Sequence, residues 1–365
     1  MSHHLKKFFI RISLLTLLLS CSALFLFDSL KAGQLEDGLG AEKKGDYSTA
    51  FKLLRPLAEQ RNPMAAFHVG MFYQNGLGAK KNIIEAIKWY RLSGEQGVAD
   101  AQYNLGVTYE HGTGVPKDYT EAMKWYRLSA AQGHVNAEFN LGGMYMNGRG
   151  VTQDYSEAMK WYRLAAAQKD AGAQYNIGVM YAEGRGVSQD FAEAMKWYRL
   201  SASNGHAGAQ CNIGGLYLNG RGVTQDYSEA LKWYRLAAAK NDANAQNNLG
   251  VLYYEGQGVP QNYIEGLKWL HLAAAQGHVG AQFGLGLAYA NGTGSKQSVD
   301  FKKAIKWWLL AAAQGHVDAQ YNLGVLYQNG LGVAQNKNDA LKWYHKAADQ
   351  GNNLAIRAIQ SLQKK

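Results

Sequence analysis

The chain has 365 residues, of which 47% are hydrophobic and only four are proline. This composition excludes a disordered chain and is typical of packed helices. The formal net charge is +10 at pH 7, which favours acidic partners or anionic surfaces.

Residues 1–32 have the pattern of a secretory leader. Three basic residues, Lys6, Lys7 and Arg11, precede an uncharged run over residues 12–27. A basic segment followed by an apolar one is the pattern of a signal peptide. The uncharged run has 16 residues, which is short for a membrane span of about 20. The sequence therefore predicts export.

Three fates of this leader are compatible with its residues. Cleavage near Ala32 is favoured, because the apolar run continues past Cys21. Lipidation is the second, because Leu-Leu-Ser-Cys, ending at Cys21, resembles the lipobox of bacterial lipoproteins. Retention as an uncleaved anchor is the third. Each fate places the rest of the chain outside the cytoplasm, either in the periplasm, secreted, or tethered as a lipoprotein.

Cleavage near Ala32 would change both the charge and the cysteine content. It lowers the net charge from +10 to +7 and leaves Cys211 as the only cysteine. The processed chain then has no intramolecular disulfide. Cys211 occupies a position that is Phe or Tyr in most other repeats, which predicts a buried structural thiol.

The remainder of the chain is an internal repeat. Trp followed by an aromatic residue or Leu recurs every 36 residues, with one step of 38, at Trp89, Trp125, Trp161, Trp197, Trp233, Trp269, Trp307 and Trp343. A glycine after an aliphatic residue keeps the same period, at Gly70, Gly106, Gly142, Gly178, Gly214, Gly250, Gly286 and Gly324. A period of this length indicates a solenoid whose units share one core.

The period divides the chain after the leader into a capped array, read as one elongated domain. Residues 33–61 are expected to form an incomplete N-terminal unit, and residues 352–365 a C-terminal capping helix. Eight full units are expected at 62–97, 98–133, 134–169, 170–205, 206–241, 242–277, 278–315 and 316–351.

Each unit is predicted to be a helix, a Gly-rich loop and a second helix. Apolar residues recur at helical spacing in both segments. Asp118 followed by Glu121 predicts a capping box at the start of one second helix, in which each side chain accepts from the other residue's free amide. The same pair recurs in other units. The fold class is therefore all-α.

The units follow the pattern A-x-x-x-(L/I)-G-x-x-Y-x-x-G-x-G-V-x-x-(D/N)-Y-x-E-A-x-K-W-Y-R over residues 62–351. This pattern resembles the Sel-1-like repeat family, a relative of the tetratricopeptide repeats. The resemblance implies a right-handed α-solenoid superhelix of antiparallel helix pairs, used as a scaffold for protein–protein contacts. Exported bacterial members are implicated in host contact, envelope assembly and signalling. A cysteine-rich subgroup is linked to β-lactam binding, but its paired cysteines are absent here.

Two positions seven residues apart on each first helix share one face and are the candidate partner-binding groove. The upper position is mostly aromatic and the lower one is variable, which indicates solvent or ligand. The alternative, which the residues support equally well, is that the aromatic side chains pack on neighbouring helices and that the lower position is solvent-exposed surface without a binding role. The candidate residues are Phe67, Tyr103, Glu110, Phe139, Met146, Tyr175, Tyr254, Phe283 and Tyr321.

A second candidate surface is a row of loop arginines, Arg149, Arg185 and Arg221, in three consecutive units. Such a row could dock an acidic partner. Ordinary solvated charge is the favoured interpretation. The Lys and Arg of the K-W-Y-R segments are interpreted as helical ion pairs with the preceding Glu.

Signals for catalysis, metal or cofactor binding are weak. Four inter-unit histidines, His134, His206, His278 and His316, are expected to lie too far apart to share a zinc ion. We therefore expect no catalytic, cofactor or metal site, and export argues against nucleic acid. The predicted function is a non-enzymatic exported scaffold for a protein or peptide, with membrane contact only through the leader or a lipid anchor. The alternative is an envelope enzyme or cell-wall binder like the cysteine-rich subgroup.

Overall fold

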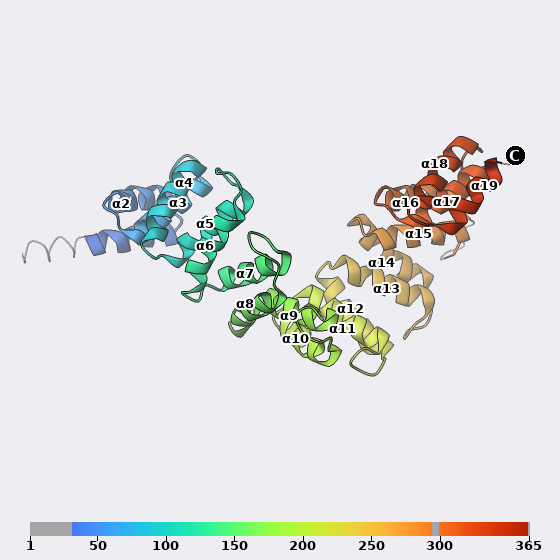
Figure 1. Ribbon diagram of the computed structural model, residues 1–365, viewed down its shortest axis with the longest axis horizontal. Coiled ribbons are helices and arrows are strands. Elements are labelled where there is room, and N and C mark those ends of the chain that lie inside the picture. Colours follow the sequence, from blue (N-terminus) through green and yellow to red (C-terminus); the bar gives the residue numbers. More distant parts are fainter. Residues whose placement is uncertain (1–30, 294–298, 364–365) are drawn as a thin grey trace, which may run out of the picture. The chain divides into compact units, whose positions relative to one another are not determined.

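The structure is a computed structural model that describes residues 31–293 and 299–363. The predicted leader up to residue 30, with Cys21, lies outside the described residues, as do the last two lysines. All regular structure within the described ranges is helical, and consecutive helices pack as pairs (Figure 1). The predicted all-α class is confirmed.

Residues 31–43 form the first described helix, followed by α2 (Tyr47–Glu59). The first helices of the repeats are α3 (Pro63–Asn75), α5 (Ala99–His111), α7 (Val135–Asn147), α9 (Ala171–Glu183), α11 (Ala207–Asn219), α13 (Ala243–Glu255), α15 (Val279–Asn291) and α17 (Val317–Asn329). The second helices are α4 (Ile83–Glu95), α6 (Tyr119–Ala130), α8 (Tyr155–Ala167), α10 (Phe191–Ser203), α12 (Tyr227–Ala239), α14 (Tyr263–Ala275), α16 (Phe301–Ala313) and α18 (Lys337–Ala348). The last helix is α19 (Asn353–Gln363).

These helices belong to two compact units that are described separately. One unit ends at Gln168 and contains the helices up to α8, and the other begins at Lys169 and contains α9 to α19. No helix among the described residues is both long enough and apolar enough to cross a membrane.

The second helices start where the sequence predicts, but only half of the predicted capping box forms. Asp118 Oδ1 accepts hydrogen bonds from the amides of Thr120 and Glu121 at 2.9 and 3.0 Å. The amide of Asp118 donates to the Tyr109 carbonyl of the first helix instead of to Glu121. The Glu121 carboxylate accepts from Trp125 Nε1 at 2.9 Å. The reciprocal bond was wrongly predicted because the first helix already satisfies that amide.

The loop between the two helices of a repeat packs on the preceding repeat. Gly150 adopts a left-handed φ of 71°, and a Cβ there would lie 2.7 Å from the backbone carbonyl carbon of Tyr119, at the start of α6. Only glycine combines this conformation with such a close approach. The second Gly of the G-x-G segment therefore couples neighbouring repeats.

Within a repeat, the recurring glycine of the first helix contacts the recurring tyrosine of the second. Tyr126 is fully buried, and a Cβ added at Gly106 would lie 2.5 Å from its ring. The same close approach joins Gly142 to Tyr162. The glycine is thus a packing position, and the ring takes the volume that a side chain would occupy.

Between repeats, the recurring tryptophan packs against the preceding helix pair. Trp125 is 4% exposed and belongs to the same apolar cluster as Tyr90 and Leu105. A Cβ added at Gly94 would lie 3.3 Å from the Trp125 ring. Small residues near the end of each second helix therefore make room for the tryptophan of the following one.

A buried polar ladder, which the sequence analysis missed, also joins neighbouring repeats. Gln102 donates to the Gly94 carbonyl of the preceding repeat at 2.9 Å and accepts from Gln132 Nε2 at 2.8 Å. The corresponding position is glutamine in most repeats, but Glu138 occupies it in one of them. Glu138 is 4% exposed, and Gln168 donates to its Oε2 at 2.9 Å.

Replacing this buried carboxyl by the glutamine of the other repeats is expected to stabilise the fold. Burial raises the pKa of Glu138, so its ionised form disfavours the folded state. At pH 7, the free energy of unfolding of the Glu138→Gln variant should exceed that of the wild type by about 1 kcal/mol, because the glutamine amide can donate a hydrogen bond to a carbonyl as Gln102 does.

The advantage should shrink as the pH falls, because the wild-type carboxyl becomes neutral below its pKa and the penalty on the folded state is then lost. Urea unfolding of both chains between pH 4.5 and 8 measures this difference. A difference that does not change with pH would mean that the charge is not its cause.

Candidate functional site

The aromatic residues of the upper position are half-buried and pack on the second helix of their own repeat. Tyr103 lies 5.8 Å from Tyr126 between ring centroids, and Tyr175 lies 5.9 Å from Tyr198. The other upper-position contacts of this kind are Phe67 with Tyr90, Phe139 with Tyr162, Phe283 with Trp308 and Tyr321 with Tyr344. Each of these upper-position residues remains partly accessible to solvent.

The histidines between repeats have a structural role that the sequence analysis missed. His134 and His206 cap the first helices α7 and α11, because each Nδ1 accepts the amide of the third residue on, at 3.3 and 3.1 Å. Their rings stack on Tyr103 and Tyr175 of the preceding repeats at 4.7 and 4.5 Å. Part burial lowers the pKa of His206, which favours the neutral ring that this cap requires.

The lower position is occupied by scaffold contacts in several repeats. The Glu110 carboxylate accepts from the buried Tyr126 hydroxyl at 2.7 Å and pairs with Arg149 at 3.6 Å. Gln328 accepts from Tyr344 in the same way at 2.6 Å. Met146 is half-buried. The structure thus brings together two predicted site residues, Glu110 and Arg149, and holds them to each other.

The two remaining loop arginines are also engaged. Arg185 pairs with Glu183 at 2.6 Å, and the Arg221 guanidinium lies 5.5 Å from the centroid of the Phe191 ring. Both arginines are exposed. Among the described residues, Arg149 and Arg185 pair with carboxylates while Arg221 contacts a ring, so Arg221 is the loop arginine best placed to meet an acidic group.

The basic residues of the K-W-Y-R segments divide into two kinds. The lysines form the predicted ion pairs with the preceding Glu, such as Lys196 with Glu193 at 2.7 Å. The arginines reach the next repeat instead, where Arg127 donates to the Tyr145 hydroxyl at 2.7 Å and Arg199 to Tyr217 at 2.8 Å. Helical ion pairing therefore accounts for the lysines but not for these arginines, which bond to a tyrosine of the next first helix.

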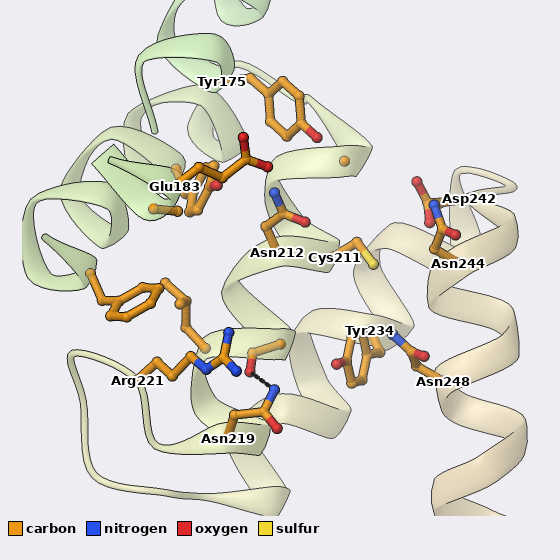
Figure 2. Close-up of a pocket in the computed structure, with 16 residues that line it drawn as sticks. Tyr175, Glu183, Cys211, Asn212, Asn219, Arg221, Tyr234, Asp242, Asn244 and Asn248 are labelled. Carbon is orange, nitrogen blue, oxygen red and sulfur yellow. Dashed lines mark hydrogen bonds between the residues drawn. The ribbon is translucent and has the colours of Figure 1, made fainter. Parts of the chain in front are cut away.

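The first-helix face contains a cavity of about 420 Å³ over α9, α11 and α13 (Figure 2). Three small residues of α11, Gly208, Cys211 and Gly215, line it at spacings of three and four residues. No other repeat combines three residues this small: Gly143 matches Gly215, but its repeat has Phe139 in place of Cys211, and most repeats have larger side chains at both positions, such as Tyr103 and Val107. The missing side-chain volume produces the cavity.

The polar lining of this cavity consists mainly of carboxamides and tyrosines. Asn212 lies at its centre and interacts with the hydroxyls of Tyr175 and Tyr198, where burial raises the pKa of both phenols (Figure 2). Asn248 lies across from it on α13, and Arg221 lies at the lower edge. Two of the predicted site residues, Tyr175 and Arg221, thus line one cavity.

Cys211 is the one nucleophilic thiol of this lining. It is 7% exposed, and burial, with Asp242 nearby, raises the pKa of the thiol to about 12. The thiolate is therefore scarce near neutral pH, and the residue behaves as a small buried side chain. This agrees with the prediction of a structural thiol.

Two other cavities lie apart from this one. A cavity of about 290 Å³ between α13 and α15 is lined by the predicted residues Tyr254 and Phe283. A cavity of about 560 Å³ near the start of the array is lined by Glu42 and His68, which pair at 2.7 Å. No three His, Cys, Asp or Glu residues among those described lie close enough to hold a metal ion.

The sequence profile of the Sel1 repeat matches nine consecutive segments, residues 31–62, 63–98, 99–134, 135–170, 171–206, 207–242, 243–278, 279–316 and 317–352. The chain belongs to the Sel1 repeat family. The matched segments include residues 31–62, which the sequence analysis treats as an incomplete unit.

Two solved structures support the assignment. This Sel1 repeat chain is 37% identical to c5321, a protective antigen of uropathogenic Escherichia coli with an SLR fold, with a TM-score of 0.73 over 86% of this chain and 67% of that one. It is 34% identical to a Sel1 repeat protein from Oxalobacter formigenes, with a TM-score of 0.70 over 85% of this chain and 90% of that one. No curated protein sequence matches the chain.

Proposed function

We propose that this Sel1 repeat chain is an exported, non-enzymatic scaffold that binds a protein or peptide through its first-helix face. The observation that carries the proposal is the cavity over α11, where small residues open a hollow in that face. Carboxamides and tyrosine hydroxyls can hydrogen-bond a peptide backbone, and the hollow can receive one side chain. An acidic group of the partner would meet Arg221 at its edge.

The chemistry of the cavity supports binding more than catalysis. Its thiol is protonated near neutral pH, and its tyrosines are held neutral by burial. A nucleophile needs an activating base within hydrogen-bond reach, and the arrangement around Cys211 raises the pKa of the thiol instead of lowering it. The Sel1 repeat fold is typically one of protein–protein interaction, which agrees with this reading.

Filling the cavity tests the proposed site. A Cβ at Gly215 would meet only the Tyr234 hydroxyl, at 3.7 Å, so Gly215→Val should fold and close the hollow. Gly143→Val is the matched control, because Gly143 holds the same repeat position with its Cβ 3.7 Å from the Tyr162 hydroxyl. Cross-linking followed by quantitative mass spectrometry should recover the partner about tenfold less with Gly215→Val, which corresponds to about 1.4 kcal/mol.

Recovery should be unchanged with the control variant. Equal recovery with the wild type and Gly215→Val would remove the cavity from the binding site. Circular dichroism of both variants verifies that the helices are retained.

Export is part of the same proposal and rests on the leader, residues 1–32. The similarity of the chain to a protective antigen of uropathogenic E. coli supports a role for this chain in host contact or envelope assembly. Mass spectrometry of the processed N-terminus should find a free end near Gly33 or a lipid on Cys21. An intact Met1 on protein recovered from the cytoplasm would contradict export.

A further inference from the structure

The positive charge of the array is concentrated at its C-terminal end. Residues 33–265 contain 23 basic and 23 acidic residues, so this longer part is neutral. Residues 266–365 contain 11 basic and four acidic residues, and no Glu follows Glu265. The whole +7 charge of the chain after the leader therefore lies in its last hundred residues.

The described part of this charge gathers on the second helices α16 and α18. Lys302, Lys306 and Leu310 are spaced four residues apart on α16 and share one exposed face, beside Leu309. Lys342 and Lys346 have the same spacing on α18. The two helices are neighbours, because Trp343 of α18 packs against the apolar cluster of α16. We call Lys302, Lys306, Leu309, Leu310, Lys342 and Lys346 the lysine face.

Within residues 299–363, no ion pair of the kind that the earlier repeats provide involves the lysines of the lysine face. The lysine before the recurring tryptophan pairs with a Glu three residues earlier in six repeats, at Lys88, Lys124, Lys160, Lys196, Lys232 and Lys268. At Lys306 that earlier position is Lys303. At Lys342 it is Asp339, which accepts from Asn336 at 2.6 Å instead.

Two further features indicate which kind of partner the lysine face binds. Ten of the 23 basic residues before position 266 are Arg, but only one of the 11 after it is. Lysine is a compact, strongly hydrated point charge on a flexible stem, while Arg suits the bidentate recognition of a single carboxylate or phosphate, so a lysine-rich face suits attraction to a charged surface. The apolar members of the face are also accessible, with Leu309 37% and Leu310 43% exposed. Leu309 stands where earlier repeats have Arg, such as Arg235.

We propose that the lysine face binds the surface of a membrane rich in anionic phospholipid. Lysines clustered beside exposed leucines form the kind of surface that rests on lipid headgroups, with the charges in the headgroup layer and the leucines just below. This contact is additional to any made by the leader. It is independent of the proposed peptide site, since the lysine face lies on second helices and the cavity opens over α11.

Vesicle flotation of the full chain tests this contact. The probes are phosphatidylcholine vesicles with and without about one third phosphatidylglycerol. Each lysine close to an anionic surface is expected to strengthen binding about fivefold. The wild-type chain should bind the anionic vesicles far more tightly, and the difference should disappear in 0.5 M salt, where the screening length is only about 4 Å. The combined variant Lys302→Gln, Lys306→Gln, Lys342→Gln, Lys346→Gln should bind them at least about fiftyfold more weakly.

The matched control removes the same amount of charge from the neutral part of the array, through Lys88→Gln, Lys124→Gln, Lys196→Gln and Lys232→Gln. All three chains carry the same leader, so binding through the leader would be equal in all of them. Equal binding by the control and the lysine-face variant, or no preference for phosphatidylglycerol, would overturn the proposal. Capture by immobilised polyglutamate without vesicle binding would also overturn it and would identify an acidic protein as the partner.

Discussion

Gly106→Ala is expected to lower the free energy of unfolding by about 2 kcal/mol or more, even though alanine favours a helix over glycine by about 1 kcal/mol. The added Cβ would lie 2.5 Å from the ring of Tyr126, which is fully buried and cannot retreat without moving α6. The steric cost therefore exceeds the gain in helix propensity. Thermal unfolding followed by circular dichroism, with hydrogen exchange across α5 and α6, measures the loss.

Gly143→Ala is the matched control for this substitution. Its Cβ would meet only the Tyr162 hydroxyl at 3.7 Å, an ordinary contact, so the gain in helix propensity should remain and stability should rise slightly. If both alanines changed stability equally, the contact between glycine and tyrosine would not be the reason for the recurring glycine.

Trp125→Ala is expected to cost about 3–5 kcal/mol, as large-to-small changes in a core do. The indole is 4% exposed, packs against Gly94 of the preceding repeat and shares an apolar cluster with Leu105 of its own repeat. Its loss removes apolar contacts and the hydrogen bond from Nε1 to Glu121. The damage should therefore extend beyond the repeat that carries the substitution.

Hydrogen exchange resolved by segment can separate these effects. Amides of α4 and α5 should exchange faster in Trp125→Ala, together with those of α6, because the interface between the repeats opens. Acceleration confined to α6 would show that the tryptophan stabilises only its own helix. Glu121→Gln isolates the contribution of the indole hydrogen bond, and its cost should be a small part of the total.

Local signals in the sequence were sufficient to predict the repeat and the positions of its helices. The period of the tryptophans and glycines predicted the helix pairs, and Asp118 predicted the start of α6. These features depend on residues a few positions apart in one repeat. The lysine ion pairs, at a spacing of three residues, were predicted for the same reason.

Contacts that join one repeat to the next were harder to predict. The Gln102 bond to the Gly94 carbonyl of the preceding repeat, for example, depends on how closely two repeats pack. The Arg127 bond to Tyr145 likewise depends on how far two helices of different repeats approach. The regular recurrence of histidine before the first helix was a usable signal, because histidine can serve as an N-cap.

The sequence indicated which face of the repeats to consider as the candidate site, but not the cavity in that face. The first-helix face was predicted from fold resemblance, and the structure places Tyr175 and Arg221 around one cavity. The cavity itself arises from side chains that are smaller than in the other repeats. A comparison of repeats by volume, extended to Gly215, would have indicated it from the sequence alone.

The bonds that link helices and repeats have a consequence for how the chain folds and how its length can evolve. They join residues only 16, 18 or 30 positions apart, as in Tyr126 to Glu110, Arg127 to Tyr145 and Gln132 to Gln102. Such a low contact order favours rapid folding that can begin at any point along the array. An in-frame duplication or deletion of a whole repeat would keep the bonds within each repeat and recreate those between repeats at the new junction, so a lineage can lengthen or shorten the protein without inventing new contacts.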